Sequence, residues 1–83
     1  MLTKPQLENA LAEAGFNLGF FLKLALRDAR TPEQAQQYAI DAGAAAETRG
    51  EKYGAAILHG IAHGLSVPID GVTPAADKAG SPR

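Results

Sequence analysis

The chain has 83 residues, a formal net charge of −1 and no cysteine. This length fits one domain and leaves no room for a second core. The lack of cysteine excludes disulfides and thiolate zinc sites, and it is compatible with the reducing cytoplasm, where we expect the protein. The near-neutral charge argues against a dedicated nucleic-acid-binding protein, because such domains usually carry a strong basic excess.

Targeting and membrane-spanning signals are not expected. The stretch Met1 to Gly15 lacks a basic segment that leads into an apolar run, so it does not read as a signal peptide. The longest apolar run, Leu18 to Leu26, is interrupted by Lys23 and is far shorter than the roughly 20 residues that span a bilayer. We therefore expect a protein that is soluble or lies at a membrane surface.

Capping signals predict two helices in the first part of the chain. Thr3 and Gln6 have the spacing of a capping box, ahead of a helical pattern over Lys4 to Ala14. Gly15 is expected to be the C-terminal stop of this helix. The apolar segment that follows predicts a second helix over Phe16 to Ala29.

The sequence Thr31 to Gln34 marks the start of a third helix, with Pro32 at its first position. Apolar and small residues then recur at helical spacing as far as Gly64. We expect a long helix from Pro32 to about Gly64, with a bend or break near Gly50. Thr48 to Glu51 offers a second capping box, which would start a fourth helix.

The composition changes at Ser66, where a proline-containing tail with few apolar residues begins. We expect residues 1–65 to form a helical domain and residues 66–83 to form a disordered or extended tail that is not needed for folding. The predicted fold class is all-α. It is a small bundle of three helices, or four if the third one breaks, or a helical hairpin, with a C-terminal tail.

Hydrophobic side chains cover nearly all sides of the segment Phe16 to Arg30, apart from a stripe of cations formed by Lys23, Arg27 and Arg30. Such a helix must be buried nearly all round, and a chain of this size has few elements that could cover it. We therefore expect a protein partner, either a second copy or a larger assembly. The residues expected at this contact are Phe20, Phe21, Leu22, Leu26, Val67 and Ile69.

A second pattern concerns the packing inside the chain. Gly50, Gly54, Ile57 and Ile61 share one helical face. The glycines leave space on this face, so we expect it to hold the aromatic rings of the apolar segment rather than a ligand.

His59 and His63 are four residues apart, a spacing that can place two imidazoles on one metal ion. Their neighbours one turn away offer no third ligand, and Gly60 stands where the metalloprotease motif has a glutamate. We expect two exposed histidines and no cofactor. A metal or haem site at these residues stays an alternative.

No motif typical of catalysis is present, and the two serines, Ser66 and Ser81, lie in the tail. The sequence therefore predicts a non-enzymatic protein-interaction module without a nucleic-acid partner. Peripheral membrane association through Phe16 to Arg30 is the main alternative. Small cysteine-free helical proteins are common among the accessory products of bacteriophages and mobile elements, where they act as structural parts or as inhibitors. This comparison is an analogy in size and composition, with no motif behind it.

Overall fold

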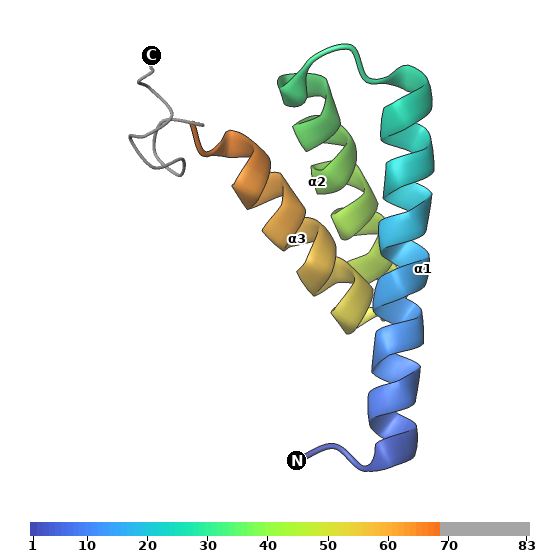
Figure 1. The fold of residues 1–83 in the computed structure, drawn as a ribbon. Coiled ribbons are helices and arrows are strands. Elements are labelled where there is room, and N and C mark those ends of the chain that lie inside the picture. Colours follow the sequence, from blue (N-terminus) through green and yellow to red (C-terminus); the bar gives the residue numbers. More distant parts are fainter. Residues whose placement is uncertain (69–83) are drawn as a thin grey trace, which may run out of the picture.

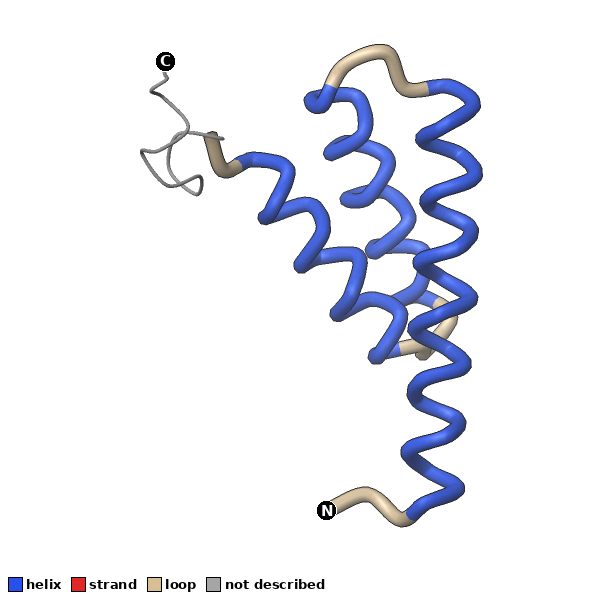
Figure 2. Tube along the Cα trace, in the orientation of Figure 1, coloured by secondary structure: helices blue, strands red, loops and turns tan. Residues whose placement is uncertain are grey.

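Three helices make up the computed structural model, which describes residues 1–68. α1 spans Lys4–Asp28, α2 spans Pro32–Thr48 and α3 spans Lys52–Ser66. α2 and α3 form an antiparallel hairpin, and α1 packs along it (Figure 1). The N-terminal part of α1 projects beyond the hairpin (Figure 2). The prediction of an all-α bundle is confirmed. Most of the predicted tail, residues 69–83, lies outside the described residues.

α1 runs without interruption through Gly15, so the prediction of separate helices over 4–14 and 16–29 is wrong. Ala10, Asn17 and Phe21 are buried on either side of Gly15, at spacings of 7 and 4 residues that place them on one helical face. A helix end at Gly15 would turn half of this face away from the core. Gly15 also lacks the positive φ typical of a glycine that ends a helix.

Both threonine caps that the sequence predicts are present. Thr3 Oγ1 accepts a hydrogen bond from the backbone N–H of Gln6 (3.3 Å), and the Gln6 side chain accepts one from the N–H of Thr3 (2.9 Å). Thr31 Oγ1 accepts a hydrogen bond from the N–H of Gln34 (3.1 Å). The Gln34 side chain accepts one from the N–H of Arg30 (2.6 Å), one residue before the cap. These local bonds start α1 and α2 where the sequence places them.

The chain turns between α2 and α3 at Gly50, whose φ is +81°. The N–H of Gly50 donates to the carbonyl of Glu47 (3.0 Å), and the N–H of Glu51 donates to the carbonyl of Ala46 (2.9 Å). Together these bonds form a Schellman motif, which requires a residue in the left-handed conformation that glycine adopts most easily. The predicted break near Gly50 is confirmed, and the helix does not continue unbroken to residue 64.

A carboxylate of α1 caps the N-terminus of α3. Glu13 Oε2 accepts hydrogen bonds from the backbone N–H groups of Tyr53 (2.8 Å) and Gly54 (3.0 Å). The first N–H groups of a helix lack partners in that helix and carry partial positive charge, so they favour a carboxylate. The capping box predicted at 48–51 is wrong, because the Thr48 hydroxyl donates back into its own helix (3.1 Å).

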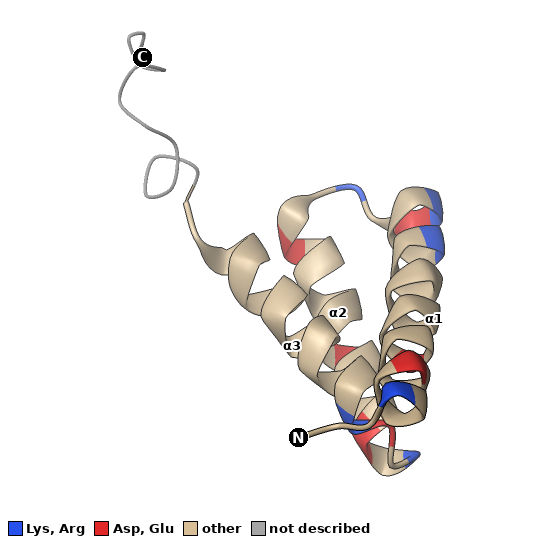
Figure 3. Cartoon of the chain, turned by 60° about the horizontal axis from the view of Figure 1, so that its bottom comes forward, with Lys and Arg blue, Asp and Glu red and all other residues tan. Residues whose placement is uncertain are grey.

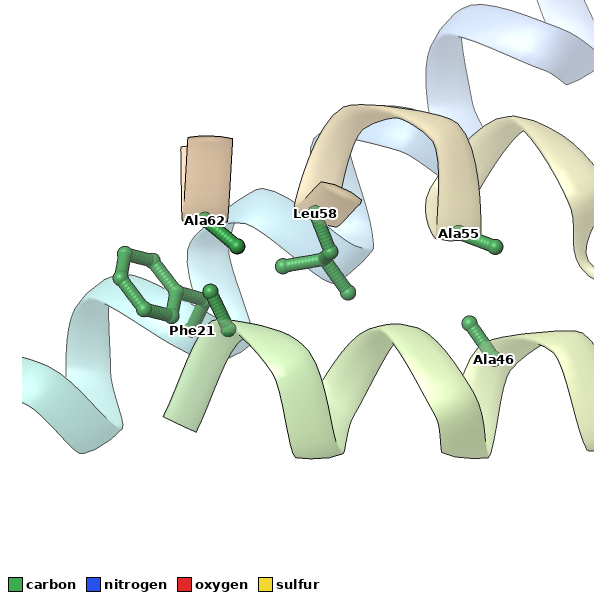
Figure 4. Packing of buried hydrophobic residues seen from close by; sticks show 6 residues of the cluster. Phe21, Ala46, Ala55, Leu58 and Ala62 are labelled. Carbon is green, nitrogen blue, oxygen red and sulfur yellow. The ribbon is translucent and has the colours of Figure 1, made fainter. Parts of the chain in front are cut away.

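The core lies between the small-residue faces of α2 and α3 and is closed by one aromatic ring from α1 (Figure 4). Leu58 is completely buried at the centre of this contact, although the sequence pattern favoured Ile57 and Ile61 as the inward residues. Both isoleucines are half-buried and pack against the core. The buried cluster consists of Phe21, Ala39, Ala46, Ala55, Leu58 and Ala62.

The side chain of Asn17, on α1, packs on the face of α3 where we expected an aromatic ring. Its carboxamide packs against Gly54, where a Cβ would collide with it. Asn17 Nδ2 donates to the carbonyl of Glu13 (2.9 Å) and to the carboxylate of Glu51 (3.2 Å), and its Oδ1 accepts from Arg49 (3.2 Å). Arg49 also donates to Glu51 (2.9 Å). These bonds satisfy the buried amide and join α1 to the turn before α3.

The contact between Asn17 and Gly54 leads to a prediction about stability. A methyl group at Gly54 displaces the buried carboxamide from its partners, so we expect Gly54→Ala to lower the free energy of unfolding by about 1–3 kcal/mol. Gly60→Ala is the matched control, since nothing lies within 4 Å of its added methyl group. The control should gain up to about 1 kcal/mol from helix propensity. Denaturant melts of both variants measure this, and equal stability changes would contradict the packing.

The ion pair of Arg49 and Glu51 predicts a dependence on pH. The hydrogen bond from Arg49 lowers the pKa of the Glu51 carboxyl below its ordinary value of 4.5, and the bond from Asn17 lowers it further. Because the folded-state pKa is the lower one, these bonds stabilise the fold above pH 4.5, and their contribution is lost as the pH falls through the folded-state pKa.

We expect the free energy of unfolding to decrease as the pH is lowered through this range, and we expect Glu51→Gln to make the decrease smaller. Urea melts across the acid range test this expectation. Part of the decrease should remain, because Arg27 also lowers the pKa of Asp28. An unchanged slope in Glu51→Gln would show that this carboxylate does not stabilise the fold.

Candidate interaction surface

The outer side of α1 exposes large apolar side chains that are not covered by residues 1–68. Their exposed fractions range from 46% at Leu22 to 84% at Leu26. Single exposed leucines are normal on protein surfaces, but a cluster on one helix of a small chain is typical of a binding surface. The exposed residues are Leu7, Leu11, Phe16, Phe20, Leu22 and Leu26.

Helical geometry divides these residues between two faces of α1. The leucine face comprises the leucines at positions 7, 11, 22 and 26, together with the half-buried Leu18. The phenylalanine face comprises Phe16 and Phe20. At 100° per residue, the centres of the two faces are about 150° apart. The buried face of α1 lies between them on the inner side, so both remain available to a partner.

The phenylalanine face borders two open hollows. One has a volume of about 390 Å³ and lies between the two rings and the ion pair of Arg49 and Glu51. The other, also of about 390 Å³, lies over Gly15 and Gly19 beside Lys23. Neither hollow encloses a ligand as a typical small-molecule site does.

The residues predicted at the partner contact fall into different environments. Leu22, Leu26 and Phe20 are exposed, whereas Phe21 is only 5% exposed and belongs to the core of its own chain. Val67 is half-buried after the end of α3. Ile69 lies outside the described residues.

The prediction of the partner contact included Phe20 but left out three exposed residues of this surface: Leu7, Leu11 and Phe16. Leu7 and Leu11 were assigned to a separate helix that ended at Gly15, so their alignment with Leu22 was not recognised. The signal was available in the spacing of the leucines, which continues in phase across Gly15. The exposure of Phe16 has no comparable signal, because it depends on which face of α1 meets the hairpin.

The predicted stripe of cations is partly neutralised. Arg27 forms two hydrogen bonds with the carboxylate of Asp28, at 2.9 and 2.7 Å. Arg30 lies beyond the end of α1, and its guanidinium donates to the carbonyl of Arg27 (3.4 Å). Figure 3 shows the charged residues of α1 toward its two ends; none lies between Glu13 and Lys23, and α3 carries only Lys52. At 100° per residue, Lys23 lies between the leucine face and the phenylalanine face on the outer side of α1, so a positive charge separates the two faces.

The two histidines are exposed, and one of them joins α2 to α3. The imidazole of His59 lies over Gly43, and its Nε2 is 2.9 Å from a carboxylate oxygen of Glu47. His63 is exposed near the end of α3. Within residues 1–68, no group of three or more His, Asp or Glu side chains is placed to hold a metal ion.

No known protein family, curated protein or solved structure matches the chain. Within residues 1–68, none of the helices combines the length and the apolar character that a membrane span requires.

The geometry at the histidines predicts weak metal binding. The His59 ring already faces Glu47 and packs on Gly43, so turning it toward a metal that His63 also binds would cost these contacts. We expect substoichiometric zinc or nickel after dialysis, measured by elemental analysis of the isolated protein. Stoichiometric metal that is lost in His59→Ala would contradict this expectation.

Proposed function

We propose that this chain is a non-enzymatic protein-interaction module that binds through the outer side of α1. The observation that carries the proposal is the exposure of six large apolar side chains on one helix. Removing apolar surface from water contributes about 25 cal/mol per Å², so a partner that covers these side chains gains a substantial driving force. The partner is a second copy of the chain or a component of a larger protein assembly.

A protein partner is favoured over a lipid surface by the charges beside α1. Helices that lie on membranes usually carry many lysines and arginines on their polar side. α1 has Lys23 and Arg27 near its C-terminal end, but Arg27 is paired with Asp28. Glu8 lies next to the leucine face and would be repelled by anionic lipids. Peripheral membrane binding is therefore the second candidate and an outcome of the test.

The biological setting is also part of the proposal. The lack of cysteine is compatible with a reducing compartment, and we place the protein in the cytoplasm. A small helical chain with one apolar binding surface suits an accessory role in an assembly, as in products of bacteriophages and mobile elements. This setting rests on analogy, whereas the binding surface rests on the exposed residues of α1.

The first test places a charge on the surface. Leu22→Lys and Leu26→Lys should each weaken binding about tenfold or more, because a lysine cannot be buried there without desolvating its ammonium group. Ile40→Lys is the matched control, since Ile40 is equally apolar and 42% exposed but lies on α2. All three variants should keep the helicity of the parent chain. Equal binding by all three variants would contradict the assignment of the surface.

The second test separates protein from lipid. A photo-cross-linking amino acid placed at Leu26, in cells that make the protein, should give protein adducts. The same amino acid at Ile40 serves as the control and should give few adducts. Binding to vesicles of phosphatidylserine and phosphatidylcholine is measured in parallel. Vesicle binding without any protein adduct at position 26 would overturn the proposal in favour of the membrane alternative.

A further inference from the structure

Six positions of α1 form a continuous line along the leucine face, which we call the seam. They are separated by 4, 4, 3, 4 and 4 residues. At 100° per residue they stay within an arc of about 100°. This is the spacing with which one helix packs along another. The seam consists of Leu7, Leu11, Gly15, Leu18, Leu22 and Leu26.

The seam has no covering element along most of its length in residues 1–68. The N-terminal part of α1 projects beyond α2 and α3 (Figure 1), and Leu7 and Leu11 in this part are exposed. Leu22 and Leu26 are exposed toward the other end. Midway, a methyl group added to Gly15 would meet no atom within 4 Å. The seam can therefore receive a helix along most of its length.

We infer that a second copy of this chain covers the seam, with the two α1 helices antiparallel about a two-fold axis near residues 15–18. This inference rests on the proposed function and names the partner at the same surface. The order of spacings is the same when read from either end. In an antiparallel pair, Leu7 therefore meets Leu26 of the second copy, and Leu11 meets Leu22. A two-fold axis requires such self-complementarity.

Charged residues beside the seam favour the antiparallel direction. Glu8 and Lys23 lie on the same side of the seam, near its opposite ends. Antiparallel helices bring Glu8 close to Lys23 of the second copy, twice in each dimer. Lys4 continues the seam at its N-terminal end. In a parallel pair it would face Lys4 of the second copy, and the two like charges would repel each other. In the antiparallel pair it reaches the C-terminal end of the second helix, where the helix dipole is negative.

The glycine near the centre of the seam gains a role in this arrangement. Glycine is unfavourable inside a helix, and nothing in residues 1–68 packs on Gly15 that would require it. In the dimer, Gly15 leaves room for a leucine of the second copy to approach the backbone. One pair of helices gives an interface at the low end of the usual size range, so we expect a dissociation constant of about 1–100 µM.

Disulfide trapping tests the direction of the pair, because the chain has no cysteine of its own. Proteins carrying Leu7→Cys and Leu26→Cys are mixed under mild oxidation, with one of them isotope-labelled. The mixed disulfide between positions 7 and 26 should form in excess over both symmetric disulfides. These positions are about 28 Å apart along one helix, so a bond between them cannot form within one chain. Predominance of the symmetric disulfides would overturn the antiparallel arrangement.

A pair of glycine variants tests the seam without adding charge. Gly15→Ala should raise the dissociation constant about tenfold or more, because its methyl group lies at the helix crossing. Gly60→Ala is the matched control on α3, where the added methyl group is also unopposed. Both substitutions favour the helix, so both should raise the melting temperature measured in dilute solution, by up to about 8 °C. Equal dissociation constants would overturn the role of the seam.

The outcomes separate this inference from the proposed function. A chain that sediments as a monomer at about 100 µM, well above the expected dissociation constant, overturns the inference. If the cross-linker at position 26 still captures a different protein, the proposed function stands without the dimer. If the chain is a monomer and gives no protein adduct, both are overturned.

Discussion

The arrangement of the helices depends on one carboxylate in the middle of α1. Glu13 accepts hydrogen bonds from two amides at the start of α3, whose own turn supplies no side-chain cap. One helical turn further along, the buried Asn17 binds both members of the ion pair of Arg49 and Glu51. These contacts fix the position of α1 against the hairpin and its rotation about its own axis. That rotation decides which residues of α1 lie on its inner side and which lie on its outer side.

Once that rotation is set, the large apolar residues of α1 are divided unequally. Phe21 enters the core, where it meets the small side chains of α2 and α3, while the leucine and phenylalanine faces remain outside. The core of the hairpin consists mainly of alanine, with Leu58 at its centre. Most of the bulky apolar surface of this chain is thus placed where a partner can cover it. This distribution relates a modest core to the proposed function in binding.

The close approach of α2 and α3 also accounts for the position of one histidine. Gly43 brings the two helices so close that the His59 ring lies over its backbone, within reach of Glu47. The spacing of His59 and His63 suggested a metal site when read along one helix. The tertiary structure gives His59 a second neighbour on α2, which the spacing alone could not reveal. A contact between helices is therefore an alternative explanation for this histidine.

The sequence by itself determined the helical fold, the starts of α1 and α2 and the break at Gly50. These features depend on bonds between residues a few positions apart, such as the threonine caps at Thr3 and Thr31. Only the tertiary structure decided which face of α1 meets the hairpin, the cap that Glu13 gives to α3 and the burial of Leu58. Each of these features depends on which distant segment packs against the helix. The local sequence pattern allows several rotations of a helix about its own axis, and only the packing of its neighbours selects one of them.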